Sequence, residues 1–131
     1  MGLMTRAEFL RPAERRYRVV KLPTGGEVRL QSLTAGEMRQ LKQSLINPDG
    51  KLNKKRGDRL QYLLLSWAIV DENGGRLFSE EDALSSDFDN IDGAIVSMIY
   101  DQAKNWTGFL SDGDFSAIED AVKNSESTQE S

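Results

Sequence analysis

The amino-acid sequence predicts a mainly α-helical α+β fold, in which an N-terminal β-hairpin is followed by four to five helices and a disordered C-terminal tail. Within residues 18–31, hydrophobic and polar side chains alternate on either side of a Gly-rich turn, as they do in paired strands. From residue 35 onward, hydrophobic residues recur at helical spacing. Residues 124–131 contain no hydrophobic side chain and cannot support a packed structure. We therefore expect one domain over residues 1–123.

Length and composition exclude several classes of protein. The chain has 131 residues, of which 29% are charged, and it contains neither cysteine nor histidine. The lack of cysteine excludes disulfides and thiolate chemistry, and the lack of histidine removes the usual general base and the commonest transition-metal ligand. No apolar run approaches the ~20 residues of a membrane span, and the N-terminus lacks the apolar core of a secretory signal. We expect a cytoplasmic protein that is not an enzyme and needs no cofactor.

Residues 1–16 are polar and basic, and we predict a loose arm with one helical turn at Arg6–Leu10. A basic cluster spans this arm and the first strand, and it consists of Arg11, Arg15, Arg16 and Arg18. The cluster is either a solvated approach to the strand or a nucleic-acid-binding surface. The acidic remainder of the chain and the lack of a nucleic-acid motif weigh against the second interpretation.

The hairpin is predicted from Arg18 to Gln31. Pro23 fixes one dihedral angle of its turn, and Gly25 and Gly26 can adopt positive φ without steric cost. Because an isolated hairpin is marginal in water, it must pack against the following helices or against another chain. We expect both, with one strand edge open for another copy and one face packed inward. The inward-facing residues are Val20, Leu22, Val28 and Leu30.

A capping box predicts where the first helix begins. Thr34 is the expected N-cap and Glu37 the expected N3 residue, so each would satisfy a backbone N–H of the other. The helix should cover residues 35–46. Turn-forming residues follow it, and we predict a loop over residues 47–57 that includes a consecutive basic run, Lys54, Lys55 and Arg56.

The second helix, over residues 58–70, is the expected centre of the core. A helix that is apolar nearly all round is buried on several sides, or it uses one side as an oligomer interface. We favour the first alternative. The apolar residues of this helix are Leu60, Tyr62, Leu63, Leu64, Leu65, Trp67 and Ile69.

Residues 71–82 combine a Gly-rich turn with the acidic start of a further helix, for which Ser79 is the expected N-cap. The segment is comparable to a calcium-binding loop, but the invariant glycine position falls on Arg76 and the twelfth position on Asp82 instead of glutamate. A turn between helices, followed by acidic residues that suit the helix dipole, explains the same pattern. We therefore predict no metal site.

The longest helix is predicted over residues 90–106, with Gly108 as its C′ residue. Three aspartates surround its start: Asp87, Asp89 and Asp92. They are expected to be caps and dipole partners, because no nearby base or nucleophile would make them a catalytic pair. A short last helix is predicted over residues 114–123.

Charge is divided unevenly along the chain. The net charge is −4, but residues 1–59 carry +8 and residues 60–131 carry −12. Either the two halves pair their charges within one molecule, or the basic end of one copy meets the acidic end of the next. Contact between two different patches is heterologous and gives rings or filaments. Surface charge pairs are individually weak, so we expect apolar side chains to carry the affinity: Trp67, Trp106 and Phe109.

Three motifs occur in a fixed order. The first is the turn Leu22-Pro23-Thr24-Gly25, the second is the helix start Leu33-Thr34-Ala35-Gly36-Glu37, and the third runs from Asp71 to Asp82. Their order and spacing resemble those of the tail assembly chaperones of long-tailed bacteriophages and prophages, in the short form made without a ribosomal frameshift. The resemblance spans residues 17–100.

The resemblance implies a non-enzymatic protein of the bacterial host cytoplasm that is absent from the mature virion. Such chaperones self-associate, coat the long tape measure protein, keep its apolar helices soluble and help recruit tail tube subunits. It also implies a head-to-tail ring or spiral of copies, and a longer frameshifted form that would contact the tail tube protein. Neither nucleic acid nor a membrane is an expected partner.

We predict a self-association and partner surface on the hairpin and on nearby aromatic side chains. Its candidate residues are Arg18, Leu22, Pro23, Gly25, Gly26, Arg29, Trp67, Trp106 and Phe109. Two other classes stay open. A nucleic-acid-binding regulator would use the basic N-terminal half and would shift DNA or RNA in a salt-dependent way. Another phage morphogenesis protein, such as a tail completion or head–tail connector subunit, would persist in purified virions.

Overall fold

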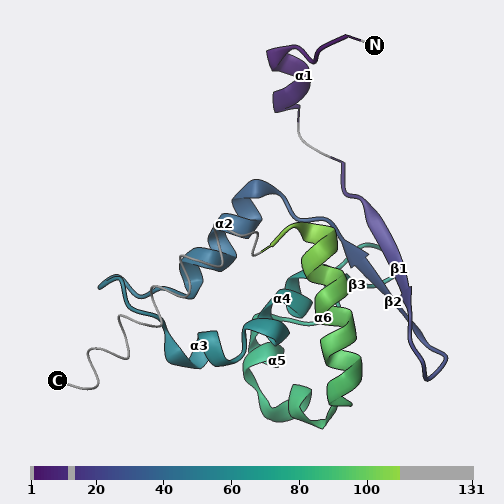
Figure 1. Cartoon of the computed structure of the whole chain (residues 1–131), viewed down its shortest axis with the longest axis vertical. Coiled ribbons are helices and arrows are strands. Elements are labelled where there is room, and N and C mark those ends of the chain that lie inside the picture. The colour runs from purple at the N-terminus through teal and green to yellow at the C-terminus, as the bar shows by residue number, and fades with distance from the viewer. Residues whose placement is uncertain (1, 12–13, 110–131) are drawn as a thin grey trace.

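The computed structural model describes residues 2–11 and 14–109, and it confirms the mainly helical α+β fold (Figure 1). The predicted last helix and tail lie outside the described residues. Within the described ranges, no helix has the length and apolar character needed to cross a bilayer. The elements in chain order are α1 (Arg6–Leu10), β1 (Tyr17–Lys21), β2 (Glu27–Gln31), α2 (Ala35–Ser44), α3 (Lys54–Asp58), α4 (Leu60–Ala68), β3 (Ile69–Val70), α5 (Glu80–Leu84), the 3-10 helix η1 (Ser86–Asn90) and α6 (Gly93–Thr107).

The predicted hairpin forms between β1 and β2. Its antiparallel register places Val20 opposite Val28. Two hydrogen bonds close the turn: the Leu22 N–H donates to the Gly26 carbonyl over 2.8 Å, and the Gly25 N–H donates to the Leu22 carbonyl over 3.0 Å. Gly25 has a φ of +101°, in the left-handed region where a side chain would be strained. The turn therefore depends on glycine at this position.

A third strand, β3, extends the sheet where the sequence predicts the end of a helix. Helix α4 stops at Ala68, and Ile69 is extended, with φ −81° and ψ 126°. Ile69 and Val70 pair antiparallel with Leu30 and Arg29 of β2, so the strand order is β1-β2-β3. The prediction of a helix as far as residue 70 is wrong because these β-branched residues gain a partner strand that is distant in sequence.

Helices α4 and α6 build the core against the inner face of the sheet. Leu30 is fully buried and Val20 is 8% exposed, and α6 contacts both β1 and β2 (Figure 1). Helix α4 contacts both α5 and α6, which confirms that it is a central core element. The buried core residues are Val20, Leu30, Leu33, Leu41, Leu45, Leu63, Leu64, Leu65, Ala68, Ile69, Ala83, Val96, Ile99, Ala103 and Phe109.

The predicted helix caps are present. The Thr34 hydroxyl accepts from the Glu37 N–H over 3.1 Å, and the Glu37 carboxylate accepts from the Thr34 N–H over 2.8 Å. Ser79 and Asp82 form the same reciprocal pair at the start of α5. Gly108 ends α6 in the left-handed conformation, with φ +75°. These caps fix where the chain enters and leaves its helices.

The loop predicted over residues 47–57 is partly wrong, because it contains helix α3. A β-bridge between Ile46 and Leu52 closes the turn, and the Asn53 side chain then caps a helix that starts at Lys54. The polar composition of this segment favours a loop, but a helix cap needs only one side-chain oxygen, which Asn53 supplies. The other predicted helix boundaries lie within three residues of those observed.

Candidate interaction surface

The outer face of the sheet, on the side away from α6, is open and partly apolar. A hollow of about 640 Å³ lies along it. Tyr17 and Val19 of β1 are 38% and 53% exposed, and Leu77, which follows β3, is 52% exposed. We call this region the outer-face hollow. Two of its lining residues, Val28 and Ile69, also pack against or within the core. The full lining is Tyr17, Val19, Glu27, Val28, Arg29, Ile69, Val70, Asp71, Glu72 and Leu77.

Arg29 lies across the outer-face hollow. Its guanidinium carbon is 3.9 Å from the centroid of the Tyr17 ring, a cation–π distance. Its Nη1 donates to the Glu72 carbonyl oxygen over 2.9 Å. Three acidic residues, Glu27, Asp71 and Glu72, line the hollow together with this single basic residue. The hollow therefore presents apolar side chains with a net negative charge around them.

The same sheet leaves one strand edge open. Strand β1 is the first in the sheet order, and among the described residues only β2 pairs with it. The far edge of β3 is partly occupied, because Val70 forms a bridge with Arg76 and the Leu77 N–H donates to the Ile69 carbonyl over 3.1 Å. An unpaired strand edge can accept a further strand through main-chain hydrogen bonds. The open edge of β1 and the outer-face hollow meet at Tyr17 and Val19.

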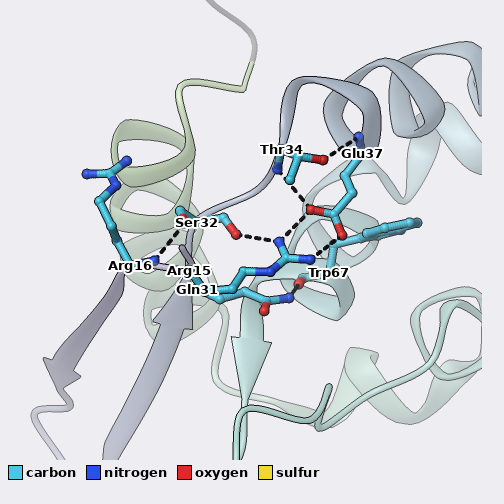
Figure 2. Close-up of polar contacts among 7 residues, drawn as sticks. All are labelled: Arg15, Arg16, Gln31, Ser32, Thr34, Glu37 and Trp67. Carbon is cyan, nitrogen blue, oxygen red and sulfur yellow. Dashed lines mark hydrogen bonds and ion pairs between the residues drawn. The ribbon is translucent and has the colours of Figure 1, made fainter. Parts of the chain in front are cut away.

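A polar cluster anchors the start of β1 to the start of α2 (Figure 2). The Arg15 guanidinium donates to both carboxylate oxygens of Glu37, over 2.5 and 2.7 Å, and to the Ser32 carbonyl over 2.8 Å. The Arg16 N–H donates to the Ser32 hydroxyl over 2.9 Å. Beside them, the Gln31 amide donates to the Trp67 carbonyl over 2.7 Å. The arm is thus held in place from Arg15 onward, because one bidentate pair fixes its direction.

The ion pair at this junction makes stability depend on pH. The hydrogen bond from Arg15 is the main reason that the pKa of Glu37 is lowered, and the same bond raises the pKa of Arg15. At α5, burial favours the neutral form of Glu80, but hydrogen bonds from Trp67 and Arg56 outweigh it and lower the pKa of Glu80. Both carboxylates therefore hold their charge more readily in the folded chain than in the unfolded chain.

The free energy of unfolding should fall as the pH drops below the usual glutamate pKa of 4.5. Groups whose pKa is lowered by folding stabilise the chain above their unfolded pKa, and that contribution is lost as the pH passes through the folded value. Denaturant unfolding of the protein and of a Glu37→Gln, Glu80→Gln variant, at several pH values between about 3 and 7, would measure it. Glutamine still completes a capping box, so the variant should lose the pH slope while keeping its helices. An unchanged slope in the variant would contradict the assignment.

Two of the predicted partner residues, Trp67 and Trp106, are half-buried and already in contact within the chain. The Trp67 indole N–H donates to Glu80 over 2.8 Å, and the Arg76 guanidinium lies 4.4 Å from the centroid of its ring. The Arg16 guanidinium lies 4.6 Å from the Trp106 ring centroid. Contacts within the chain therefore cover most of the surface of these aromatic side chains.

Phe109, which is predicted from the sequence to be a partner contact, is not a surface residue of the described chain. Its side chain is 1% exposed and belongs to the core. The left-handed conformation of Gly108 reverses the chain at the end of α6. The Phe109 N–H then donates to the Thr107 hydroxyl over 3.2 Å. The sequence places Phe109 beyond the helix but does not reveal that the chain turns back toward the core.

The predicted hairpin residues divide into two groups. Arg18 and the turn residues Pro23, Gly25 and Gly26 are exposed. The tip of the hairpin extends beyond β3, which pairs only with the other end of β2 (Figure 1). Leu22 is half-buried and packs against the core. The structure therefore brings Arg29 into the outer-face hollow and leaves the turn as a separate projection.

Sequence reasoning missed the residues that make the outer-face hollow apolar. Tyr17 and Val19 alternate with the inward-facing positions of β1, so the two-residue period assigns them to the other face. No pattern in the sequence assigns Leu77 to the same surface. Only the position of β3 shows that these side chains share one surface, and β3 was predicted as helix.

Some of the basic residues of the first half of the chain pair with acidic residues of the second half within the same molecule. Arg56 lies 3.1 Å from Glu80 and Arg59 lies 3.4 Å from Asp89, which joins basic residues of the first half to acidic residues of the second. Other basic side chains remain exposed: Arg11, Arg18, Lys54 and Lys55. Local pairing therefore accounts for part of the charge division and leaves part available at the surface.

The segment compared with a calcium loop is a hydrogen-bonded turn. One Asp71 carboxylate oxygen accepts from the Asn73 N–H over 2.8 Å and from the Gly75 N–H over 3.0 Å. In the part of the chain that the structure describes, no group of three or more acidic side chains could hold a metal ion.

Comparison of the chain with models of protein families, with curated proteins and with solved structures finds no match.

Proposed function

We propose that this protein is a phage tail assembly chaperone that self-associates, coats the tape measure protein and helps recruit tail tube subunits. The observation that carries the proposal is a single sheet that offers an open strand edge and an exposed, partly apolar outer face. The order and spacing of the turn, helix-start and Asp71–Asp82 motifs supply the link to tail assembly chaperones.

A coat along a helical protein many times longer than this chain needs many copies in a repeated arrangement. Such an arrangement uses two different patches on each copy, so that each contact leaves a free patch for the next. Apolar side chains at the contact provide the stabilisation, because exposed charge pairs contribute little. The outer-face hollow supplies an apolar patch, and the edge of β1 supplies main-chain donors and acceptors.

The arginine contacts within the chain weigh against a nucleic-acid-binding regulator. Arg15 is committed to Glu37, and Arg56 and Arg59 lie beside carboxylates of the second half. Arginine binds nucleic acid chiefly through phosphate contacts. Residues that already face carboxylates would have to exchange those partners for phosphates.

Co-expression with the tape measure protein of the same phage tests the proposed function. The full chain should increase the soluble fraction of the tape measure protein and should co-purify with it as a particle of high mass. Purified virions should lack the chain, which separates a chaperone from a tail completion or connector subunit. A tape measure protein that stays insoluble and never co-purifies with the chain would overturn the proposal, as would finding the chain in virions.

A further inference from the structure

We infer that the N-terminal arm of one copy docks into the outer-face hollow of a second copy. This inference names the contact through which copies of the chain would self-associate. It rests on the proposed function only for the expectation that copies associate. The docking part of the arm is residues 2–11, which include α1. The donor and the acceptor are different patches of the same chain, so the contact is heterologous and can repeat from copy to copy.

The arm carries exposed apolar side chains that do not pack in the hydrophobic core of their own described chain. Every residue from 2 to 11 is exposed, and none of them belongs to the hydrophobic core of the described chain. The exposed apolar residues of the arm are Leu3 at 100%, Met4 at 62%, Phe9 at 74% and Leu10 at 57%. So many large apolar side chains in so short a segment indicate an interaction site.

The arm also has a defined shape. The Thr5 side chain accepts from the Glu8 N–H over 3.2 Å and starts α1. The helical turn places Phe9 and Leu10 together at its end. Because an isolated helix this short is marginal in water, docking would stabilise it.

The outer-face hollow matches the arm in polarity and in charge. Its exposed apolar residues, Tyr17, Val19 and Leu77, provide a surface for apolar side chains of the arm. Its lining residues include three acidic residues and one arginine. The arm carries two arginines, Arg6 and Arg11, against one glutamate. Complementary charge favours this pairing over contact between two hollows.

A second copy is the occupant, because the exposed arm stands apart from its own sheet. Arg15 is held at the start of α2 by Glu37 and by the Ser32 carbonyl. Figure 1 shows α1 standing apart from the rest of the chain, beyond the end of β1 that is opposite the hairpin turn. The arm therefore leaves its own hollow uncovered.

Because the chain contains no cysteine, introduced cysteines can test this contact in the full-length protein. A Leu10→Cys variant is mixed with a Leu77→Cys variant under mild oxidation, without any tape measure protein. The yield of disulfide-linked heterodimer from this mixture should be at least ten times the yield from a mixture of Leu10→Cys with Ile91→Cys. Ile91 is a suitable control because it is 40% exposed and lies outside the lining of the hollow. Equal yields from the two mixtures would overturn the inference.

Loss of the apolar contact gives an independent measurement. A Phe9→Ser, Leu10→Ser variant should weaken self-association at least tenfold in sedimentation equilibrium, whereas Ile91→Ser should change it less than twofold. Both variants replace exposed side chains, so their circular dichroism should match that of the parent protein. Self-association unaffected by the arm variant would overturn the inference, as would a cross-link that forms only within single molecules of a Leu10→Cys, Leu77→Cys variant. Failure of this contact while the tape measure protein still co-purifies would leave the proposed function standing.

Discussion

Replacing Phe109 with alanine should lower the free energy of unfolding by about 3–5 kcal/mol. The side chain is 1% exposed and packs in the hydrophobic core, so its removal leaves a cavity that the neighbouring residues cannot fill completely. The turn at Gly108 and the hydrogen bond from the Phe109 N–H to Thr107 fix its position. Against a typical total stability of about 5–15 kcal/mol, this loss is large.

Urea unfolding of the Phe109→Ala variant measures this loss, and the matched control is Phe9→Ala. Phe9 is the same residue type, but it is 74% exposed, so its substitution should change the free energy of unfolding by no more than about 0.5 kcal/mol. If Phe109 were a surface residue that contacts a partner, its substitution would be equally mild in the isolated chain. Similar stabilities for the two variants would therefore contradict the burial of Phe109.

Replacing Leu30 with alanine should lower the free energy of unfolding by about 2–5 kcal/mol. Leu30 is fully buried and lies on the middle strand of the sheet, opposite Arg18 on one side and Ile69 on the other. Its side chain joins the sheet to the helical core. The substitution therefore weakens the packing that supports the hairpin, which could not stand alone.

The matched control for Leu30 is Leu77, which is 52% exposed on the outer face. A Leu77→Ala variant should unfold within about 0.5 kcal/mol of the parent protein, although it should weaken self-association. Denaturant unfolding monitored by tryptophan fluorescence and by circular dichroism would compare the two variants. A mild effect at Leu30, or a severe effect at Leu77, would show that the two faces of the sheet are assigned the wrong way round.

The parts of the fold that depend on neighbours in sequence could be predicted. The hairpin turn needs a glycine that tolerates positive φ at Gly25, and the capping box needs Thr34 and Glu37 three residues apart. Each of these requirements is visible in a few consecutive residues. The hairpin, the start of α2 and the end of α6 at Gly108 were accordingly predicted within a few residues.

The parts that depend on distant contacts could not be predicted. Ile69 and Val70 continue the apolar pattern of α4, and only their pairing with β2 makes them a strand. Phe109 follows a helix end, and only the direction of the chain after Gly108 buries it. The outer-face hollow has the same origin, because its lining comes from strands and a turn that are far apart in sequence. Of the predicted partner residues, Arg29 alone lines this hollow.

Light scattering of the full-length protein over a wide range of concentrations tests self-association most directly. The open edge of β1, the exposed outer-face hollow and the apolar arm all predict contacts between copies. Because a heterologous contact leaves a free patch on each end, the mean mass should rise with concentration beyond that of a dimer. A mass of one chain at every concentration would contradict the account.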